Sequence, residues 1–271
     1  PIGMNQEEST KSAALDIKVK QAPPGLVLEW LSKGWRDVRI AGSASLLHGL
    51  IVSILSIVIT AMTLLYWKLL PGAVSGFVLI GPFLATGLYV LSCKVGKSEP
   101  TSIKDAINAW RYSSKCLMLF GSLLILGATA WVVFSVAMFH FFIPVDIDHP
   151  IDFLKYVLTQ DDGTFMLWTM LGGIGAALAF SMTVVGLPLL VERDITTPKA
   201  VYASIRAVSE NPATMLLWAM VILMITGISF ATLMLGFIVL YPLLGHASWH
   251  AYKDLVDADA LPLRAEFPAN E

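Results

Sequence analysis

The chain has few charged side chains. Asp, Glu, Lys and Arg make up 14% of its 271 residues, whereas 56% are hydrophobic and the mean hydropathy is +0.72. A soluble domain carries about 25% charged residues, so this chain does not have enough charge to cover itself with an aqueous surface. The composition excludes an ordinary soluble protein. It predicts an all-α, polytopic membrane protein whose surroundings are the lipid bilayer, with no nucleic-acid partner.

Cysteine is also scarce, and the two that occur, Cys93 and Cys116, form neither a disulfide framework nor a CxxC pair. Residues 1–22 are polar and lack an apolar core, so we expect no cleavable signal peptide. We interpret residues 1–22 as a flexible polar tail, 23–256 as a single membrane domain and 257–271 as a C-terminal tail.

Long apolar runs predict where the chain crosses the bilayer, because a helix needs roughly 20 apolar residues to span about 30 Å of hydrocarbon. The run 213–249 is 37 residues long, about 55 Å as one helix, and is better read as two short crossings with a turn near 226–229. The alternative is one tilted helix and five spans in all. The favoured reading is six spans in three hairpins: 46–67, 72–93, 117–143, 165–191, 213–228 and 230–249.

The basic residues orient the chain. With six spans, 16 of the 18 Lys and Arg residues lie on one side, and only Lys68 and Lys155 lie on the other. The positive-inside rule then places both termini in the cytoplasm. With five spans, Lys253 and Arg264 would move to the outside, which weakens this bias without reversing it.

The sequence has a threefold internal pattern. A short amphipathic segment precedes each hairpin, and in the first of them Lys33, Arg36 and Asp37 lie opposite the apolar stripe. These segments either lie in the headgroup layer or pack on the cytoplasmic ends of the spans. Pro82, Pro188 and Pro242 occupy matching places near the ends of the outgoing helices. The three stripes are Leu28, Leu31, Trp35 and Val38; Ile103, Ala106, Ile107 and Trp110; and Val201, Ile205 and Val208.

Ionisable side chains are missing from the predicted membrane cores, which contain no Asp, Glu, Lys or Arg. Proton relays, ion-coupled carriers and intramembrane hydrolases normally need such groups at depth. We therefore do not expect an enzyme, although a pathway for a neutral solute stays open.

Small residues recur at four-residue spacing in the fourth span, where they allow two helix backbones to approach closely. They either pack within this chain or dock another membrane subunit. The three pairs are Gly172 with Ala176, Gly173 with Ala177, and Gly175 with Ala179.

His246 and His250 share one helix face, a spacing that can hold a metal ion. His48 is the third candidate ligand, and a haem would need it or another chain. The alternative is that these side chains anchor a helix end at the membrane boundary, where aromatic and histidine side chains collect. We favour anchoring, and so expect no cofactor.

Five segments of the sequence, WLSKGWRD, GFVLIGPFLATGLY, ERD, ENP and PLLGHASWHAY, resemble a bacterial family of integral membrane proteins, domain of unknown function 2189, over residues 26–256. Some members are labelled cytochrome c oxidase subunits, so the resemblance implies a respiratory connection and no catalytic residues. The function we expect is a non-catalytic accessory subunit or assembly factor of an inner-membrane complex. The alternatives are a carrier of a neutral solute and a protein that handles metal or haem through His48, His246 and His250.

Overall fold

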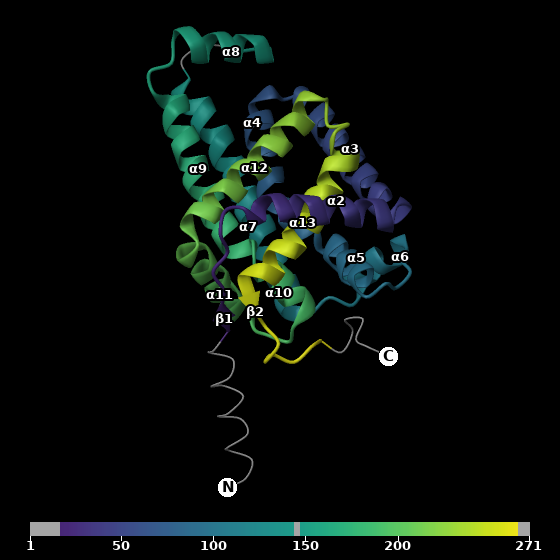
Figure 1. Cartoon of the computed structure of the whole chain (residues 1–271). Helices are drawn as coiled ribbons and strands as arrows, with labels where there is room; N and C mark the ends of the chain where they lie inside the picture. Colours follow the sequence, from purple (N-terminus) through teal and green to yellow (C-terminus); the bar gives the residue numbers. More distant parts are fainter. Residues whose placement is uncertain (1–16, 144–146, 265–271) are drawn as a thin grey trace.

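The structure, a computed structural model, describes residues 17–143 and 147–264. It is a bundle of helices with one small antiparallel sheet (Figure 1). The elements are β1 (Lys18–Val19), α2 (Leu26–Ala41), α3 (Ser43–Leu64), η1 (Trp67–Leu69), α4 (Leu70–Leu84), α5 (Thr86–Gly96), α6 (Ile103–Arg111), α7 (Lys115–Phe142), α8 (Pro150–Thr159), α9 (Thr164–Thr183), α10 (Gly186–Glu192), α11 (Thr197–Glu210), α12 (Pro212–Ala231), α13 (Phe237–Leu255) and β2 (Val256–Asp257).

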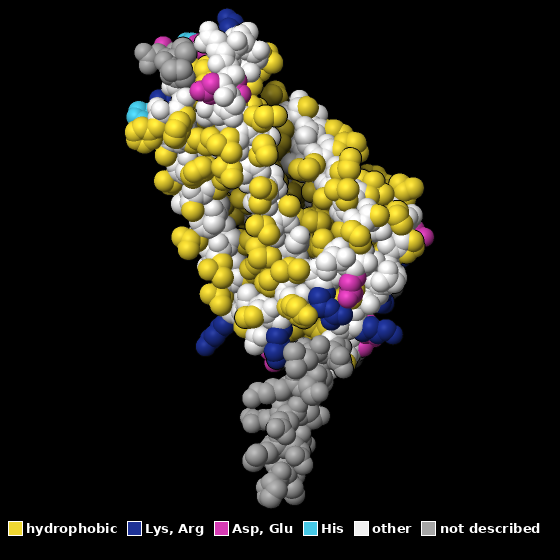
Figure 2. Space-filling model, turned by 90° about the vertical axis from the view of Figure 1, so that its left-hand side faces the viewer, with side chains coloured by type: hydrophobic (Ala, Val, Ile, Leu, Met, Phe, Trp, Pro, Cys, Tyr) yellow, Lys and Arg dark blue, Asp and Glu magenta, His cyan; other side chains and the backbone are white. Residues whose placement is uncertain are grey.

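Among the described residues, five segments are long and apolar enough to cross a membrane: Ser43–Leu64, Trp67–Gly96, Lys115–Phe142, Thr164–Glu192 and Pro212–Ala231. The helix α13, which carries most of the predicted sixth span 230–249, is not among them. Most large apolar side chains that remain exposed lie on α3, α7, α9 and α12. Figure 2 shows one face of this apolar surface, with Lys and Arg side chains gathered toward its lower end. The prediction of an all-α polytopic membrane bundle is confirmed.

The third hairpin consists of α12 and α13, joined by residues 232–236. The predicted turn at 226–229 is wrong, because these residues continue α12. The Ser229 hydroxyl donates to the Ile225 carbonyl of the same helix, so this short polar side chain is satisfied without a turn. The backbone reverses later, where Leu233 and Met234 have positive φ angles.

Both ends of the described chain lie at the same end of the bundle, because β1 pairs with β2. Residues 17–22, expected to belong to a flexible tail, are held there instead, and Ile17 and Ala22 are buried. The Asn211 side chain accepts from the Ala22 backbone N–H at 2.8 Å and donates to the Lys20 carbonyl at 3.1 Å.

Two of the outgoing membrane helices are broken. A break at Ala85 separates α4 from α5, and a break at 184–185 separates α9 from α10, whereas α13 is continuous. Pro82 lies before the first break, Pro188 lies after the second, and Pro242 lies inside α13. The prediction that the three prolines occupy matching places is therefore wrong.

Small residues lie where each amphipathic helix meets the end of a hairpin. A Cβ atom on Gly87 of α5 would lie 2.9 Å from the Cβ of Ala106 in α6, and one on Gly34 of α2 would lie 2.9 Å from the Ala247 nitrogen of α13. Gly186 of α10 makes a looser contact with α11, since its Cβ would lie 3.5 Å from the Ala200 carbonyl oxygen. Since a larger side chain would separate these backbones, the small residues fix how the helices meet.

These contacts arrange the ends of the three hairpins in a ring. The ends α5, α10 and α13 contact one another, and each is covered by an amphipathic helix: α6 on α5, α11 on α10 and α2 on α13. Each amphipathic helix thus packs on the hairpin before it, and the first, α2, closes the ring on the last. The structure supports the threefold organisation that the sequence suggested.

Candidate functional site

Asp37 lies at the centre of a buried polar cluster. Its Oδ2 atom accepts from the Ser92 hydroxyl at 2.8 Å and lies 2.6 Å from His250 Nε2, while Arg36 Nη2 lies 3.3 Å from Oδ1. Placing Asp37 on the polar face of α2 was wrong, because its side chain is fully buried. Burial raises the pKa of Asp37, but the hydrogen bond to His250 and the attraction between the two groups outweigh it, so the pKa lies below its usual value.

His246 extends the cluster toward the membrane helices. Its Nδ1 atom lies 2.5 Å from Ser92 Oγ, and its Nε2 atom lies 2.6 Å from Ser45 Oγ. The single proton of Ser92 is donated to Asp37, so Nδ1 must carry a proton and donate to Ser92. Nε2 is then the acceptor for the Ser45 hydroxyl, and both ring nitrogens are engaged.

This Asp37–His246 cluster, made up of Asp37, Ser45, Ser92, His246 and His250, joins α2, α3, α5 and α13. It therefore lies where α2 closes the ring on α13. A buried carboxylate whose donors come from two other helices holds those helices in one register, since displacing any of them leaves a charge without its partner.

His48 lies outside this cluster and is bonded to the backbone at the break between α4 and α5. Its Nε2–H donates to the Leu84 carbonyl at 2.9 Å, and the Tyr241 hydroxyl donates to the Gly81 carbonyl at 2.6 Å. The two rings stack, with centroids 6.0 Å apart. Both side chains satisfy carbonyl groups beside the break, where the helix itself supplies fewer donors.

The three candidate metal ligands are not brought together as a ligand set. His246 uses both nitrogens in bonds to serines, His250 is bound to Asp37, and His48 is bound to a carbonyl. Within residues 17–143 and 147–264, no group of three or more His, Cys, Asp or Glu side chains is arranged to hold a metal ion. His48, His246 and His250 are therefore not arranged as a set of metal ligands.

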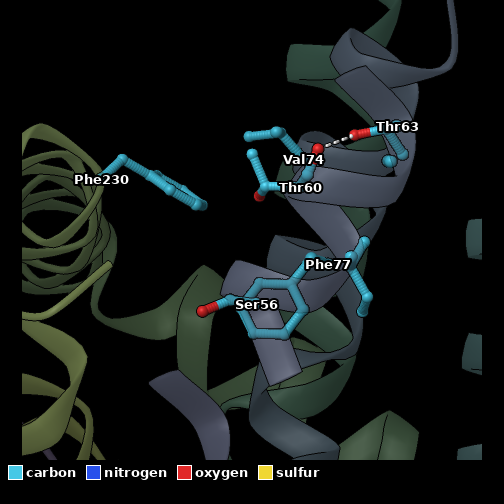
Figure 3. A pocket seen from close by; sticks show the side chains of 8 residues that line it. Ser56, Thr60, Thr63, Val74, Phe77 and Phe230 are labelled. Atoms are coloured by element: carbon cyan, nitrogen blue, oxygen red, sulfur yellow. Dashed lines mark hydrogen bonds between the residues drawn. The ribbon is translucent and has the colours of Figure 1, made fainter. Parts of the chain in front are cut away.

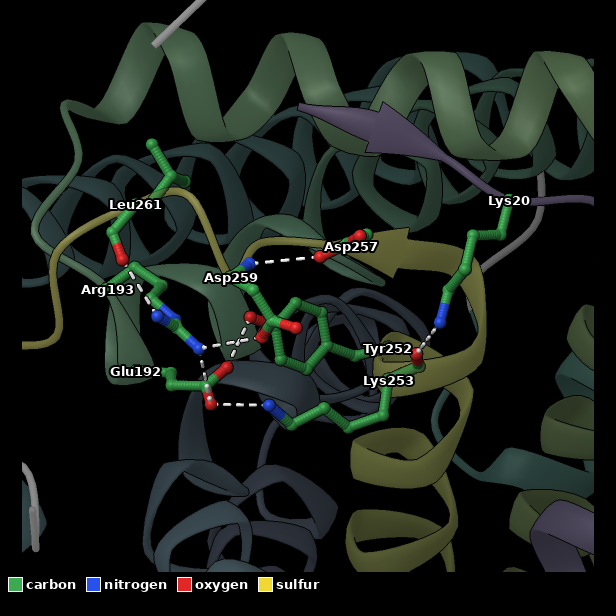
Figure 4. A network of polar contacts seen from close by, with 8 residues as sticks. All are labelled: Lys20, Glu192, Arg193, Tyr252, Lys253, Asp257, Asp259 and Leu261. Atoms are coloured by element: carbon green, nitrogen blue, oxygen red, sulfur yellow. Dashed lines mark hydrogen bonds and ion pairs between the residues drawn. The ribbon is translucent and has the colours of Figure 1, made fainter. Parts of the chain in front are cut away.

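A second polar cluster surrounds the buried carboxylate of Glu192 (Figure 4). Tyr252 donates to Glu192 Oε2 at 2.5 Å, Lys253 pairs with Oε1, and Arg193 lies 3.5 Å from Oε1. Burial and the neighbouring carboxylate raise the pKa of Tyr252 well above its usual value, so Tyr252 stays a donor. Arg193 also donates to the Leu261 carbonyl at 2.8 Å, which fastens the segment after β2 to the end of α10.

Residues 69–192 match the model of a family described as predicted integral membrane protein (DUF2189). No curated protein and no solved structure matches the chain. The match confirms the family resemblance over α4 to α10. It includes Ser92 and Glu192 and leaves Asp37 and His246 outside.

Three of the short segments that carry the resemblance meet in these polar clusters: WLSKGWRD supplies Asp37, ERD supplies Glu192, and GHASWHAY supplies His246 and Tyr252. Asn211 of ENP instead bonds the backbone of Lys20 and Ala22. The only indication of these clusters in the sequence was the presence of polar residues within otherwise apolar segments. The sequence did not show that they bind one another, because they are up to 215 residues apart, from Asp37 to Tyr252.

The small residues of α9, which lies within the stretch matched by the family model, have two different surroundings. A Cβ atom on Gly172 would lie 3.0 Å from the Trp131 ring of α7, whereas one on Gly173 or Gly175 would meet nothing within 4 Å. Ala177 is exposed, and Ala176 and Ala179 are half-buried. The packing reading therefore fits Gly172, and the face that carries Gly173 and Ala177 is left uncovered.

A small pocket lies between α3, α4 and α12 (Figure 3). Its volume is about 10 Å³, room for about one water molecule. Hydroxyl groups of α3 and aromatic rings line it, and the residues are Ser56, Ile59, Thr60, Thr63, Ala73, Val74, Phe77 and Phe230.

Proposed function

We propose that this integral membrane protein is a non-catalytic accessory subunit or assembly factor that packs against another membrane protein. The uncovered face of α9 carries this proposal. Glycines at helix contacts inside the chain are covered: a Cβ on Gly72 of α4 would lie 3.0 Å from Ser135 of α7, and one on Gly49 would collide with Ile238. Gly173 is also a glycine in a membrane helix, but a Cβ atom on it would meet nothing within 4 Å. This face therefore leaves room for a helix of another protein to approach closely.

The Asp37–His246 cluster supports a structural role over catalysis. Ser45, His246 and Asp37 contain the residue types of a hydrolase triad, but all three are fully buried. Each polar atom of His246 is paired with a serine of the same chain, so a substrate would have to displace the contacts that close the ring. The cluster is best explained as the fastening between α2 and α13.

The carrier alternative receives little support from the described pocket, because space for about one water molecule does not accommodate a larger solute. The alternative that the protein handles metal is not supported by its histidines, because each of them is bonded to other side chains or to the backbone. We propose a respiratory cytochrome c oxidase as the partner complex; this choice rests on the resemblance and on the uncovered α9 face together.

We further propose a bacterial inner membrane with both termini in the cytoplasm. The pairing of β1 with β2 supports the placement of both ends on one side, and the basic residues support the cytoplasmic side. A reporter fused after Glu271 should read as cytoplasmic, and a periplasmic reading would contradict this orientation.

Purification of the native protein in mild detergent, followed by mass spectrometry of what accompanies it, tests the function. A stoichiometric membrane protein should copurify with the wild type and be lost from the Gly173→Leu, Ala177→Leu double variant, which itself keeps its thermal stability. The matched control is Gly172→Leu, which should lower the stability by overpacking against Trp131, typically by about 1–3 kcal/mol. No accompanying protein in any preparation would refute the proposal.

A further inference from the structure

The three amphipathic helices share a feature on their outward faces. Each leaves a large apolar or aromatic side chain exposed, with an arginine four residues later. The exposed fractions are 45% for Trp35, 56% for Ile107 and 61% for Tyr202. Residues four apart are neighbours on a helix surface. The three pairs, which we name the collar, are Trp35 with Arg39 on α2, Ile107 with Arg111 on α6, and Tyr202 with Arg206 on α11.

Trp35 and Ile107 belong to the predicted apolar stripes, as does Leu28, which is 74% exposed, so these parts of the stripes face outward. The physical reason is that small residues face the hairpin ends on each helix. Gly34 and Ala106 make close contacts there, and Ala200 is fully buried, so side chains on the opposite side of each helix point away from the chain. Trp30 of α2, which lies on the inward side, is fully buried.

The pairs lie on the three helices that encircle the hairpin ends, in the half of the molecule that carries β1 and β2 (Figure 1). Above them is the apolar surface of α3, α7, α9 and α12, and Lys and Arg side chains gather at its lower end (Figure 2). A ring of apolar bodies and cationic tips at such a border matches the headgroup layer of a bilayer.

We propose that the collar is a set of three equivalent binding sites for anionic phospholipids of the surrounding bilayer. At each site the guanidinium donates to the lipid phosphate, which it can contact through two N–H groups at once. The Trp, Ile or Tyr side chain lies beside the upper part of the acyl chains. This inference is independent of the protein partner proposed for α9.

The repetition around the ring identifies the occupant. The three helices pack on three different hairpin ends, so the collar faces several directions at once. One partner protein would cover one of these faces, whereas a bilayer leaflet surrounds the molecule and contacts all of them.

The arginines differ in how far the chain already engages them. Arg39 makes no ion pair with any residue in the described part of the chain. Arg206 lies 3.4 Å from Glu210, donates to the Ile17 carbonyl at 3.2 Å and lies 6.0 Å from the Tyr202 ring centroid. We therefore expect Arg39 to contribute most to lipid binding and Arg206 least.

Native mass spectrometry of the full chain in detergent with phosphatidylglycerol or phosphatidylcholine tests the proposal. The wild type should retain up to three phosphatidylglycerol molecules in preference to phosphatidylcholine. Arg39→Gln should weaken phosphatidylglycerol binding about fivefold, the equivalent of one cation at an anionic surface, and Arg206→Gln should weaken it less, because Arg206 is already engaged within the chain. The test variant is Arg39→Gln with Arg111→Gln, which leaves the internal contacts of Arg206 intact, and its melting point in phosphatidylcholine should equal that of the wild type.

The matched control is Lys68→Gln with Lys155→Gln, which removes two cations from the opposite end of the bundle. It should retain phosphatidylglycerol as the wild type does. The proposal is overturned if the wild type shows no preference for phosphatidylglycerol, or if the collar variant and the control lose it equally. It is also overturned if the collar variant retains the lipid fully.

Discussion

Replacing Asp37 with Ala should destabilise the protein more than any exposed substitution on the same helix. The change removes a buried carboxylate that pairs with Ser92 and His250 and leaves the buried Ser92 and the half-buried His250 without this acceptor. Removing one partner of a buried charged pair typically costs about 3–5 kcal/mol. At about 2–4 °C per kcal/mol for a chain of this size, the melting temperature should fall by about 10 °C.

Thermal unfolding in detergent, followed through tryptophan fluorescence, measures the effect. The change should be visible there, since Trp30, on the same helix as Asp37, is buried against Trp218 with ring centroids 5.5 Å apart. Glu29→Ala is the matched control, because Glu29 is exposed on α2, and its melting temperature should stay within about 1 °C of the wild type. Equal melting temperatures for the two variants would refute the view that Asp37 fastens the ring.

The pH dependence gives a second test of the same residue. The pKa of Asp37 in the folded protein lies below its usual value of 3.8, so ionised Asp37 contributes stability that is fully present above about pH 4 and is lost as the pH falls through the folded pKa. The stability difference between the wild type and Asp37→Asn should therefore stay level from about pH 7 to 5 and shrink in more acidic solution. A difference that grew on acidification would contradict the shift.

Two further substitutions test the contacts between helices and at the chain ends. Gly49→Ala should lower the melting temperature, because its Cβ would collide with the Ile238 carbonyl, whereas Gly227→Ala meets nothing within 4 Å and should not; equal effects would show that the α3–α13 contact is loose. Asn211→Ala removes the two hydrogen bonds that this side chain makes to the segment before α2, so trypsin should cut after Lys20 sooner than in the wild type. Ser209→Ala is the control and should be cut at the wild-type rate. An unchanged cutting rate for Asn211→Ala would refute this role.

The sequence predicted the membrane helices well because apolar length is a local property. The runs that became α3, α7 and α12 were each long enough to span the bilayer and free of charge, and their burial did not depend on distant residues. The turn between α12 and α13 was placed too early because Gly227 and Ser229 were read as turn residues. Within a membrane helix both are tolerated, since neither leaves a backbone group unsatisfied.

The Asp37–His246 cluster could not be predicted from local patterns. Asp37 follows Arg36 in an amphipathic segment, so periodicity assigned it to the polar face, and only contacts with α5 and α13 make its burial possible. The same holds for the outward position of Trp35. Periodicity assigned Trp35 to the apolar stripe of its segment and left open whether that stripe faces the lipid headgroups or the spans. The close approach of Gly34 to Ala247 decides which face of α2 turns inward.

Photo-cross-linking from position 173 in native membranes tests the central claim, that the uncovered face of α9 docks another membrane protein, most directly. A photoreactive residue replacing Gly173 should give a product with the mass of this chain plus a second protein. The same residue at position 172, which faces Trp131, should give products within the chain alone. Cross-links from position 173 that reach only lipid would contradict the claim.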